Sequence, residues 1–403
     1  MLDGMLLEGM LHLPWWGDLL CVLLATHFTI ISVTLYLHRC QSHRAITLHP
    51  SVSHIFRFWL WVTTGQSTKQ WVSVHRKHHA TTEREDDPHS PHIHGINKVL
   101  LEGAELYREA ITDPNVCQEF GHGTPDDWLE RKLYTRHSFL GLGISWLAYV
   151  ILFGPLGITY WAIQMAWIPL LAAGVINGAG HYWGYRNFET QDGSTNLLNI
   201  GILIGGEELH NNHHAYPSSA KFSTKWWEFD IGWLYIRLLS ALKLAQVKKV
   251  APTPIQQNNC SENELIDIET VRAMVSSKLH VMADYAKHVT IPVLKAEIGQ
   301  AEGHYRTALK RIRKALVRER SRMTALQIEN LNQVLRDNLQ LKVVYEYQQK
   351  LTQVWSQKYS NNEGVLRAVA EWCQEAESTG IRVLEDYAKS LRNYSLQPVY
   401  NYA

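Results

Sequence analysis

The stretch His75-Arg76-Lys77-His78-His79 holds three imidazoles within five residues. Positions i, i+3 and i+4 of a helix share one face, so the three rings point into the same space. The same spacing recurs in His210-Asn211-Asn212-His213-His214, and a third group lies upstream in His38-Arg39-Cys40-Gln41-Ser42-His43. One such cluster could be a solvated basic stretch, but three clusters indicate a multi-histidine metal centre.

The spacing of these residues also bears on the geometry and size of the predicted centre. His38 and His43 are five residues apart, about 140° around an α-helix, so the helix must end or loosen between them. Asn177 and His181 form an i, i+4 pair that could face the same site, although His181 alone also fits a polar residue at a membrane boundary. Eight histidines in three clusters favour two ions, and neutral imidazole suits iron, zinc, copper and nickel alike. Three more histidines are interpreted as ordinary loop residues: His89, His92 and His94.

Composition divides the chain into two parts. Thirteen of the 15 tryptophans precede residue 234, whereas charged residues are denser after residue 260. The net charge of +1 indicates no class of partner. The five cysteines form no C-x-x-C pair, which leaves thiolate zinc and iron–sulfur sites without support and fits a reducing compartment. The N-terminus lacks the basic region and cleavage site of a secretory signal.

The tryptophan-rich part is predicted to be an integral membrane domain, residues 1–246. Residues 138–180 contain no Asp, Glu, Lys or Arg, and Gly154-Pro155-Leu156-Gly157 interrupts them near the middle. We therefore expect spans at about 17–37, 139–157 and 160–180, with interfacial helices at about 51–70 and 230–245. A buried globular helix is the alternative for the first span. Arg39 and Arg44 follow that span, so the positive-inside rule places the N-terminus outside and every histidine cluster in the cytoplasm.

The second part is predicted to be a soluble helical domain. Residues 247–263 are a linker with two prolines and a Gln-Gln-Asn-Asn run, and residues 264–403 show helical periodicity that suggests a bundle of about four helices. No catalytic motif is visible there. Arg306–Arg322 contains eight Lys or Arg, which fits docking to anionic lipid or to an acidic electron carrier, or simply a solvated helix face. No motif supports nucleic-acid binding.

The three histidine clusters resemble the three histidine boxes of the membrane fatty acid desaturases. Asp87-Pro88-His89-Ser90 and the segment from Asn177 to Arg186 also match, and the resemblance covers roughly residues 15–245. It is strongest to the Δ9, stearoyl-CoA type branch and its bacterial relatives. The resemblance implies an all-α membrane fold with a cytoplasmic di-iron cap, in which two iron ions and O₂ introduce a cis double bond into a saturated acyl chain. In that branch the double bond is placed at the Δ9 position. The resemblance also implies ten residues at the metals, Asn177 acting through a water: His38, His43, His75, His78, His79, His181, His210, His213, His214 and Asn177.

The resemblance also implies an electron donor and an acyl substrate as partners. The chain has no G-x-G-x-x-G, C-x-x-C or His-Pro-Gly-Gly, so a ferredoxin or flavoprotein reductase must supply electrons from outside. Animal acyl-CoA desaturases carry an Arg-Asp pair before the second box, where this chain has Ser73 and Val74. The acyl substrate could therefore be esterified in phospholipid rather than in CoA. We expect an integral protein of a bacterial inner membrane, with active site and C-terminus in the cytoplasm. The alternatives are a hydroxylase or oxygenase with the same boxes and a non-catalytic metal-binding membrane protein.

Overall fold

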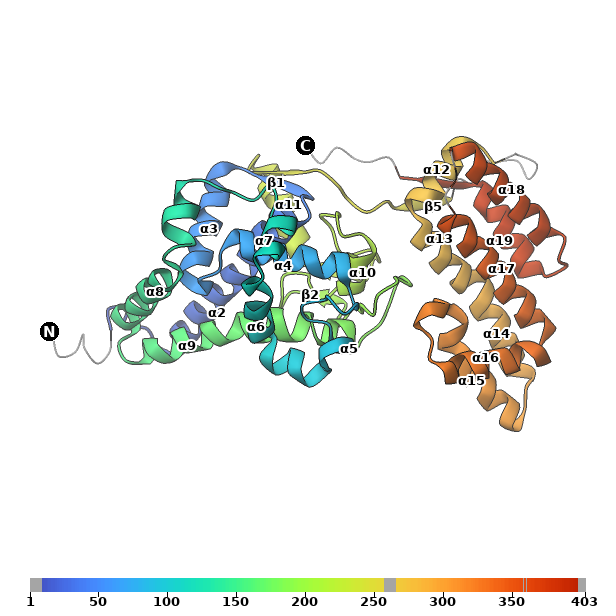
Figure 1. Cartoon of the computed structure of the whole chain (residues 1–403), viewed down its shortest axis with the longest axis horizontal. Coiled ribbons are helices and arrows are strands. Elements are labelled where there is room, and N and C mark those ends of the chain that lie inside the picture. The colour runs from blue at the N-terminus through green and yellow to red at the C-terminus, as the bar shows by residue number, and fades with distance from the viewer. Residues whose placement is uncertain (1–8, 257–265, 358, 360, 398–403) are drawn as a thin grey trace. The chain divides into compact units, whose positions relative to one another are not determined.

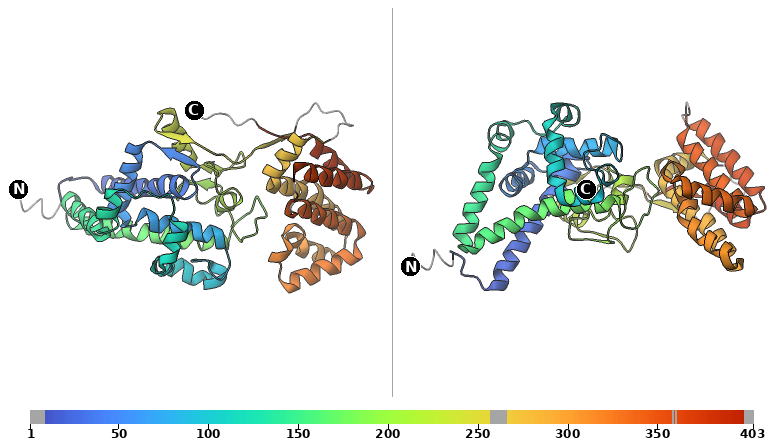
Figure 2. Two further views of the ribbon diagram at one scale, coloured as in Figure 1. Left: turned by 45° about the horizontal axis from the view of Figure 1, so that its top comes forward. Right: turned by 60° about the horizontal axis from the view of Figure 1, so that its bottom comes forward.

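The computed structural model describes residues 9–256, 266–357, 359 and 361–397. These residues form two compact units, one of residues 9–186 with 192–251 and one of residues 187–191 with the described residues between 252 and 397. Helices dominate both units (Figures 1 and 2), so the all-α expectation is confirmed.

The first unit is an assembly of helices with very little sheet. Its helices are α2 (Trp15–Ser32), η1 (Val33–Ser42), α3 (Pro50–Thr64), α4 (Thr68–Thr81), α5 (Pro91–His94), α6 (Ile96–Thr112), α7 (Pro114–Phe120), η2 (Glu130–Tyr134), α8 (Ser138–Phe153), α9 (Leu156–Ile168), η3 (Pro169–Ile176), η4 (Ala179–His181), α10 (His210–Ala215) and α11 (Ile231–Ala241). Two short strand pairs join distant segments: β1 (Ile46–Leu48) lies antiparallel to β4 (Ala245–Val247), and β2 (Ile200–Gly201) lies parallel to β3 (Phe229–Asp230).

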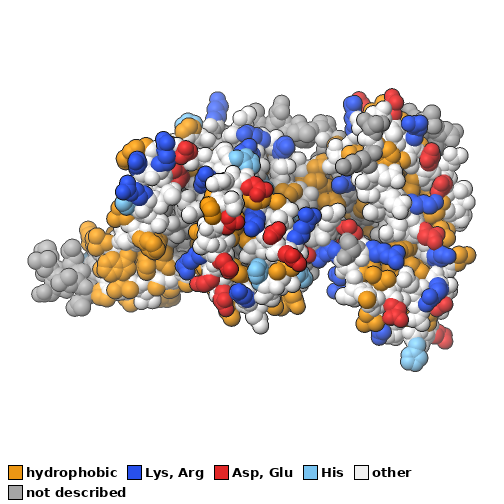
Figure 3. All heavy atoms as spheres, in the orientation of Figure 1, with side chains coloured by type: hydrophobic (Ala, Val, Ile, Leu, Met, Phe, Trp, Pro, Cys, Tyr) orange, Lys and Arg blue, Asp and Glu red, His pale blue; other side chains and the backbone are white. Residues whose placement is uncertain are grey.

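Among the described residues, two apolar helices are long enough to cross a bilayer. They run over Trp15–Ser42 and Leu156–His181, while Ser138–Phe153 and Ile231–Ala241 are apolar but shorter. Of the three predicted spans, the first and third thus have the length of a span and the second, at 16 residues, does not reach it. Hydrophobic side chains gather on the surface of α8 and α9 (Figure 3), among them the exposed Phe139, Leu147 and Ile158. An exposed apolar face of this kind suits contact with lipid.

The helix expected at 51–70 is two helices rather than one. Gly65 ends α3 in the left-handed conformation with φ 64°, and its N–H bonds back to the carbonyl of Trp61. A helix that ends on such a glycine cannot continue in the same direction. A new helix, α4, begins at Thr68 and carries the second histidine cluster.

A buried ion pair fixes the C-terminal part of η1 against the chain after α10. Arg39 Nη2 donates to Asp230 Oδ1 at 2.9 Å, and both side chains are fully buried. The guanidinium also lies 3.8 Å from the ring centroid of Phe222 and donates to the carbonyls of Ala220 and Gly205. Removing one partner of such a pair would leave an uncompensated buried charge, at a cost of about 3–5 kcal/mol.

The second unit is a helical array with its own core. Its described elements are β5 (Pro254–Gln256), α12 (Ile268–Ser276), α13 (Lys278–Tyr285), η5 (Ala286–Thr290), α14 (Ile291–Gln300), α15 (Gly303–Val317), η6 (Arg320–Arg322), α16 (Ala325–Asp337), α17 (Leu339–Ser356), α18 (Asn362–Glu377), α19 (Arg382–Arg392) and β6 (Tyr394–Leu396), with β5 antiparallel to β6. The expected bundle of about four helices was an underestimate. Side-chain N-caps at Thr324, Asn338 and Asn361 begin new helices in a pattern that looks continuous by hydrophobicity alone.

Candidate metal centre

The predicted histidines come from four separate helices of the first unit and from the residue that follows one of them. His38 lies in η1 and His43 follows it directly. The second cluster lies on α4, His181 ends the short η4, and the third cluster forms most of α10. The structure gathers their rings into two neighbouring groups: His38, His43, His75, His79 and His213 in the first, and His78, His181, His210 and His214 in the second.

The loosened helix between His38 and His43 is a π-helix. Within η1 the backbone bonds run from residue i+5 to residue i, and the last of them joins His43 N to His38 O at 3.1 Å. This extra residue per turn brings two side chains five apart onto one face, which an α-helix would not do. The prediction that the helix must loosen there is confirmed.

In the first group the ring nitrogens converge on one point. The Nε2 atoms of His43 and His75 are 2.8 Å apart. His213 Nε2 lies 3.1 Å from His38 Nε2 and 3.0 Å from His79 Nε2. At the roughly 2.1 Å of an imidazole–metal bond, two nitrogens bound at right angles lie about 3 Å apart. The spacing therefore fits one metal ion held by several rings.

The second group shows the same spacing. His181 Nε2 lies 3.2 Å from His78 Nε2 and 3.0 Å from His210 Nε2. His214 Nε2 is buried with no hydrogen-bond partner among the described residues, and its ring lies 4.7 Å from that of His181 between centroids. A buried imidazole nitrogen without a partner is costly unless it binds something, and a metal ion is the binder that this donor set suits.

Carboxylates on the outer side fix which nitrogen of each ring faces inward. His38 Nδ1 lies 2.6 Å from Glu207 Oε1, and His214 Nδ1 lies 3.0 Å from Asp192 Oδ2. An ionised carboxylate can only accept, so Nδ1 carries the proton and Nε2 keeps its lone pair for the centre. His78 Nδ1 is held in the same way by Asp87 Oδ1 at 2.9 Å.

Burial favours the neutral form of five of the clustered imidazoles. Desolvation, with help from the charges of neighbouring histidines, lowers the pKa of His43, His75, His79, His210 and His213 well below its usual value. Neutral imidazole is the form that binds a metal.

Two of the carboxylates that hydrogen-bond to the rings, Asp87 and Asp192, remain ionised. Burial alone would raise the pKa of Asp87, yet the charge of His78 and the hydrogen bond with it lower that pKa well below its usual range. Asp192 follows the same pattern with His214, and its pKa is also strongly lowered. Both carboxylates therefore serve as acceptors at neutral pH.

One histidine interpreted as an ordinary loop residue lies beside the centre. His89 is 5% exposed, stacks on His78 at 4.3 Å between ring centroids, and its Nε2 is buried without a partner among the described residues. Its position within Asp87-Pro88-His89 was the sequence signal that could have identified it. Glu207 and Asp192 were also missed, because nothing in their local sequence marks them as partners of distant histidines. His92 lies farther out, with Nε2 3.0 Å from the carbonyl oxygen of His181.

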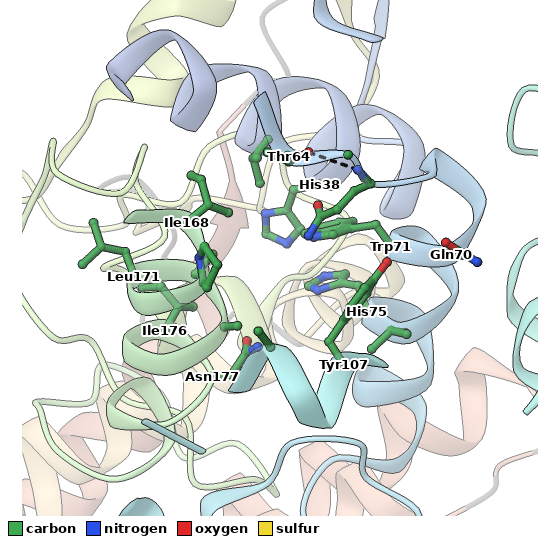
Figure 4. Close-up of a pocket in the computed structure, with 18 of the residues that line it drawn as sticks. His38, Thr64, Gln70, Trp71, His75, Tyr107, Ile168, Leu171, Ile176 and Asn177 are labelled. Atoms are coloured by element: carbon green, nitrogen blue, oxygen red, sulfur yellow. Dashed lines mark hydrogen bonds between the residues drawn. The ribbon is translucent and has the colours of Figure 1, made fainter. Parts of the chain in front are cut away.

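A cavity of about 510 Å³ leads to the two groups of histidines. His38, His75 and Asn177 line its inner end, with Trp71 and Tyr107 beside them (Figure 4). Most of its wall is apolar, with contributions from α2, η1, α3, α4, α6, α8, α9 and η3. Asn177 thus faces the same space as the histidines, although its sequence partner His181 lies deeper among the rings.

The rim of the cavity mixes apolar and charged side chains. The lining residues that are exposed are Arg108, Thr135, Phe139 and Pro169. Phe139 is 84% exposed and begins the apolar helix α8. Such a rim suits a boundary between lipid and water.

The arrangement is that of an all-helical protein that holds two metal-sized groups of histidines at the inner end of an apolar cavity. The model of the fatty acid desaturase family matches residues 13–249. The chain therefore belongs to the fatty acid desaturase family, whose members are membrane-associated enzymes that oxidise fatty acyl chains.

Known desaturases resemble the chain over this same region. It is 32% identical over 262 residues to the sn-2 palmitoyl-lipid 9-desaturase of Nostoc sp. (strain 36), covering 60% of this chain and 86% of that protein. It is 30% identical over 257 residues to the Delta-9 desaturase-like 4 protein of Arabidopsis thaliana, covering 60% and 79%. The acyl-CoA C20 Delta5-desaturase of Anemone leveillei is 31% identical over 257 residues, covering 61% and 78%. The names of these relatives include both acyl-lipid and acyl-CoA substrates.

A second family model matches the other part of the chain. Residues 271–402 match the model of a family described as transposase. This match begins within α12 of the second unit and does not reach the histidine groups.

Proposed function

We propose that the protein is an O₂-dependent desaturase that introduces a cis double bond, at the Δ9 position of a saturated acyl chain. The observation that carries the proposal is the pair of histidine groups at the inner end of an apolar cavity. The reaction removes two hydrogens from adjacent methylenes, while O₂ takes up these hydrogens together with two electrons and two protons and leaves as two waters.

The residues around the centre have separable tasks. Two iron ions, held by the nine histidines and by Asn177 through a water, would supply the oxidising chemistry that no side-chain acid or base can provide for an unactivated methylene. Glu207, Asp87 and Asp192 keep the Nδ1 protons in place, so the rings stay in the tautomer that binds metal. Trp71 stacks on His75, with 5.0 Å between centroids and 11° between planes, and holds that ring beside the cavity.

We further propose that the acyl chain enters while esterified in phospholipid. Ser73 is fully buried and Val74 is 3% exposed, so the positions that carry the Arg-Asp pair in animal acyl-CoA desaturases offer no surface for a CoA group. A Cβ added at Gly121 would lie 2.8 Å from Ser73 Oγ, which shows that the chain after α7 covers this position. The exposed Phe139 and Pro169 at the rim would face acyl chains of the leaflet, and Arg108 would lie near the phosphate.

The proposed setting is a bacterial inner membrane with the centre and the C-terminus in the cytoplasm. The positive-inside argument from Arg39 and Arg44 supports this orientation. A ferredoxin or a flavoprotein reductase would deliver the electrons, because the sequence has no flavin or iron–sulfur motif of its own.

Lipid analysis of a host that lacks the activity tests the proposal. Expression of the chain should produce a monounsaturated acyl chain, and His213→Ala should abolish it. A hydroxylated product would instead identify an oxygenase, and unchanged lipids with active electron donors present would favour a non-catalytic metal protein.

A cavity variant separates the chemistry from acyl binding. Ala172→Phe places a ring in the cavity wall and should lower desaturation while iron content is kept. Ala166→Phe, at an exposed position of α9 outside the cavity, is the control and should retain activity. For the carrier, membranes with labelled phospholipid or labelled acyl-CoA are compared while acyl transfer is blocked. Product from the CoA ester alone would overturn the phospholipid proposal.

A further inference from the structure

One helix of the second unit has a strongly basic outer face. Eight of the 17 residues from Arg306 to Arg322 are Lys or Arg, and Glu319 is the one acidic residue among them. Figures 1 and 2 show α15 beside α16 at one end of the unit. This stretch therefore concentrates positive charge on a small part of a nearly neutral chain.

The charges and the apolar residues of α15 are cleanly separated around its axis. Arg306, Lys310, Arg313 and Lys314 fall within about 100° of one another at 100° per residue, and all four are exposed. Leu309, Ile312 and Leu316 occupy a separate sector centred about 120° away from the cations, and each is at most 2% exposed within the core. The apolar residues thus anchor α15 in the core of the unit, and the cationic residues lie on its surface.

The exposed cations are not neutralised by the unit itself. No ion pair joins Arg306, Lys310, Arg311, Arg313 or Lys314 to a carboxylate among the described residues. Charges that repel one another and lack partners are an electrostatic cost that an anionic surface would relieve.

An apolar side chain protrudes beside the basic turn that follows α15. Leu326, in the first turn of α16, is 66% exposed and comes four residues after Arg322. An exposed leucine close to cations in the sequence is typical of surfaces that insert into the interface between lipid headgroups and acyl chains. A nucleic-acid backbone or a soluble acidic protein offers such a side chain less benefit.

We propose that the basic face of α15, together with the exposed Leu326 of α16, docks onto the anionic surface of a lipid bilayer. Covalent linkage to a desaturase unit of a membrane-associated family keeps the helical unit near a bilayer. The interaction holds the helical unit against the cytoplasmic leaflet, and it does not require the metal centre to be active.

The experiment uses the full chain in lipid nanodiscs of neutral phosphatidylcholine or of phosphatidylcholine with phosphatidylglycerol. Hydrogen exchange of the α15 amides is followed by mass spectrometry at low and high salt. We expect exchange about tenfold slower in the anionic discs, and the difference should shrink at high salt. The test variant is Arg306→Gln with Lys310→Gln, Arg313→Gln and Lys314→Gln, which should exchange equally in both discs.

The control variant removes four exposed cations elsewhere in the same unit: Arg272→Gln, Lys278→Gln, Lys287→Gln and Arg367→Gln. It carries the same change in net charge and should keep the protection of α15. Equal exchange of the wild-type helix in neutral and anionic discs would overturn the proposal. Protection that appears only when an acidic electron carrier or an oligonucleotide is added, whatever the lipid, would also overturn it and would identify a different partner.

Discussion

At the scale of residues, the clustered histidines could be predicted from the sequence, whereas the carboxylates that hydrogen-bond to them could not. The H-x-x-H-H spacing is local, so a short window of sequence reveals it and predicts a common direction for the rings. Glu207 meets His38 across 169 residues, and Asp192 meets His214 from a loop without regular structure. Their roles depend on tertiary contacts that a local pattern does not contain.

Glu207 should matter for metal affinity more than for folding. Glu207→Gln keeps the size of the side chain but weakens the acceptor for His38 Nδ1 and for Thr34 Oγ1, which lies 2.6 Å away. We expect iron affinity to fall by about 10–100-fold, as measured by competition with a chelator. Glu105→Gln, at an exposed position of α6, is the control. Equal affinity in both variants would mean that the carboxylate does not act on the metal ligand.

The buried histidines also predict how acid affects the metal-free protein. Their pKa values are lowered in the folded state, while in the unfolded chain imidazole titrates near 6.5. As pH falls below about 6.5, the unfolded chain therefore binds protons that the folded chain does not, and the free energy of unfolding decreases. Thermal unfolding of the metal-free protein in detergent should show a midpoint that drops between about pH 7 and pH 5. A flat profile would show that the rings are protonated as easily in the fold as outside it.

At the scale of elements, the sequence predicted helices well and their internal breaks poorly. The apolar runs near 17–37 and 160–180 are long helices, because an apolar stretch of that length has few other stable forms in a membrane. The break at Gly65 and the change from α9 to the π-helix η3 depend on backbone geometry that hydropathy does not report. The loosening of η1 could be deduced only because two histidines five apart had to converge.

Close packing of α6 on η3 should be sensitive to a single methyl group. A Cβ added at Gly103 would lie 2.7 Å from the carbonyl oxygen of Ala173, and both helices line the cavity. Gly103→Ala should therefore move α6, lower the thermal midpoint and reduce desaturation. Gly143→Ala on α8 meets no atom within 4 Å and should be neutral or slightly stabilising. Equal behaviour of the two variants would show that the contact is easily relieved.

At the scale of the whole molecule, the chain joins two units with different physical demands. The first exposes apolar helices and buries its histidines, whereas the second buries an apolar core and exposes charge. Hydrophobic periodicity and composition distinguish these two units in the sequence. The contacts that give each unit its internal packing come from side chains far apart in the chain, which no pattern in the sequence specifies.

The iron content of the purified full chain tests the central claim most directly. We predict about two iron ions per chain in the wild type, and loss of both in a variant with His213→Ala and His214→Ala, one ligand from each group. His304→Ala, at an exposed position of α15, should retain both ions. Wild-type protein that binds no iron under reducing conditions, or unchanged iron in the variant that lacks His213 and His214, would contradict a di-iron centre at these histidines.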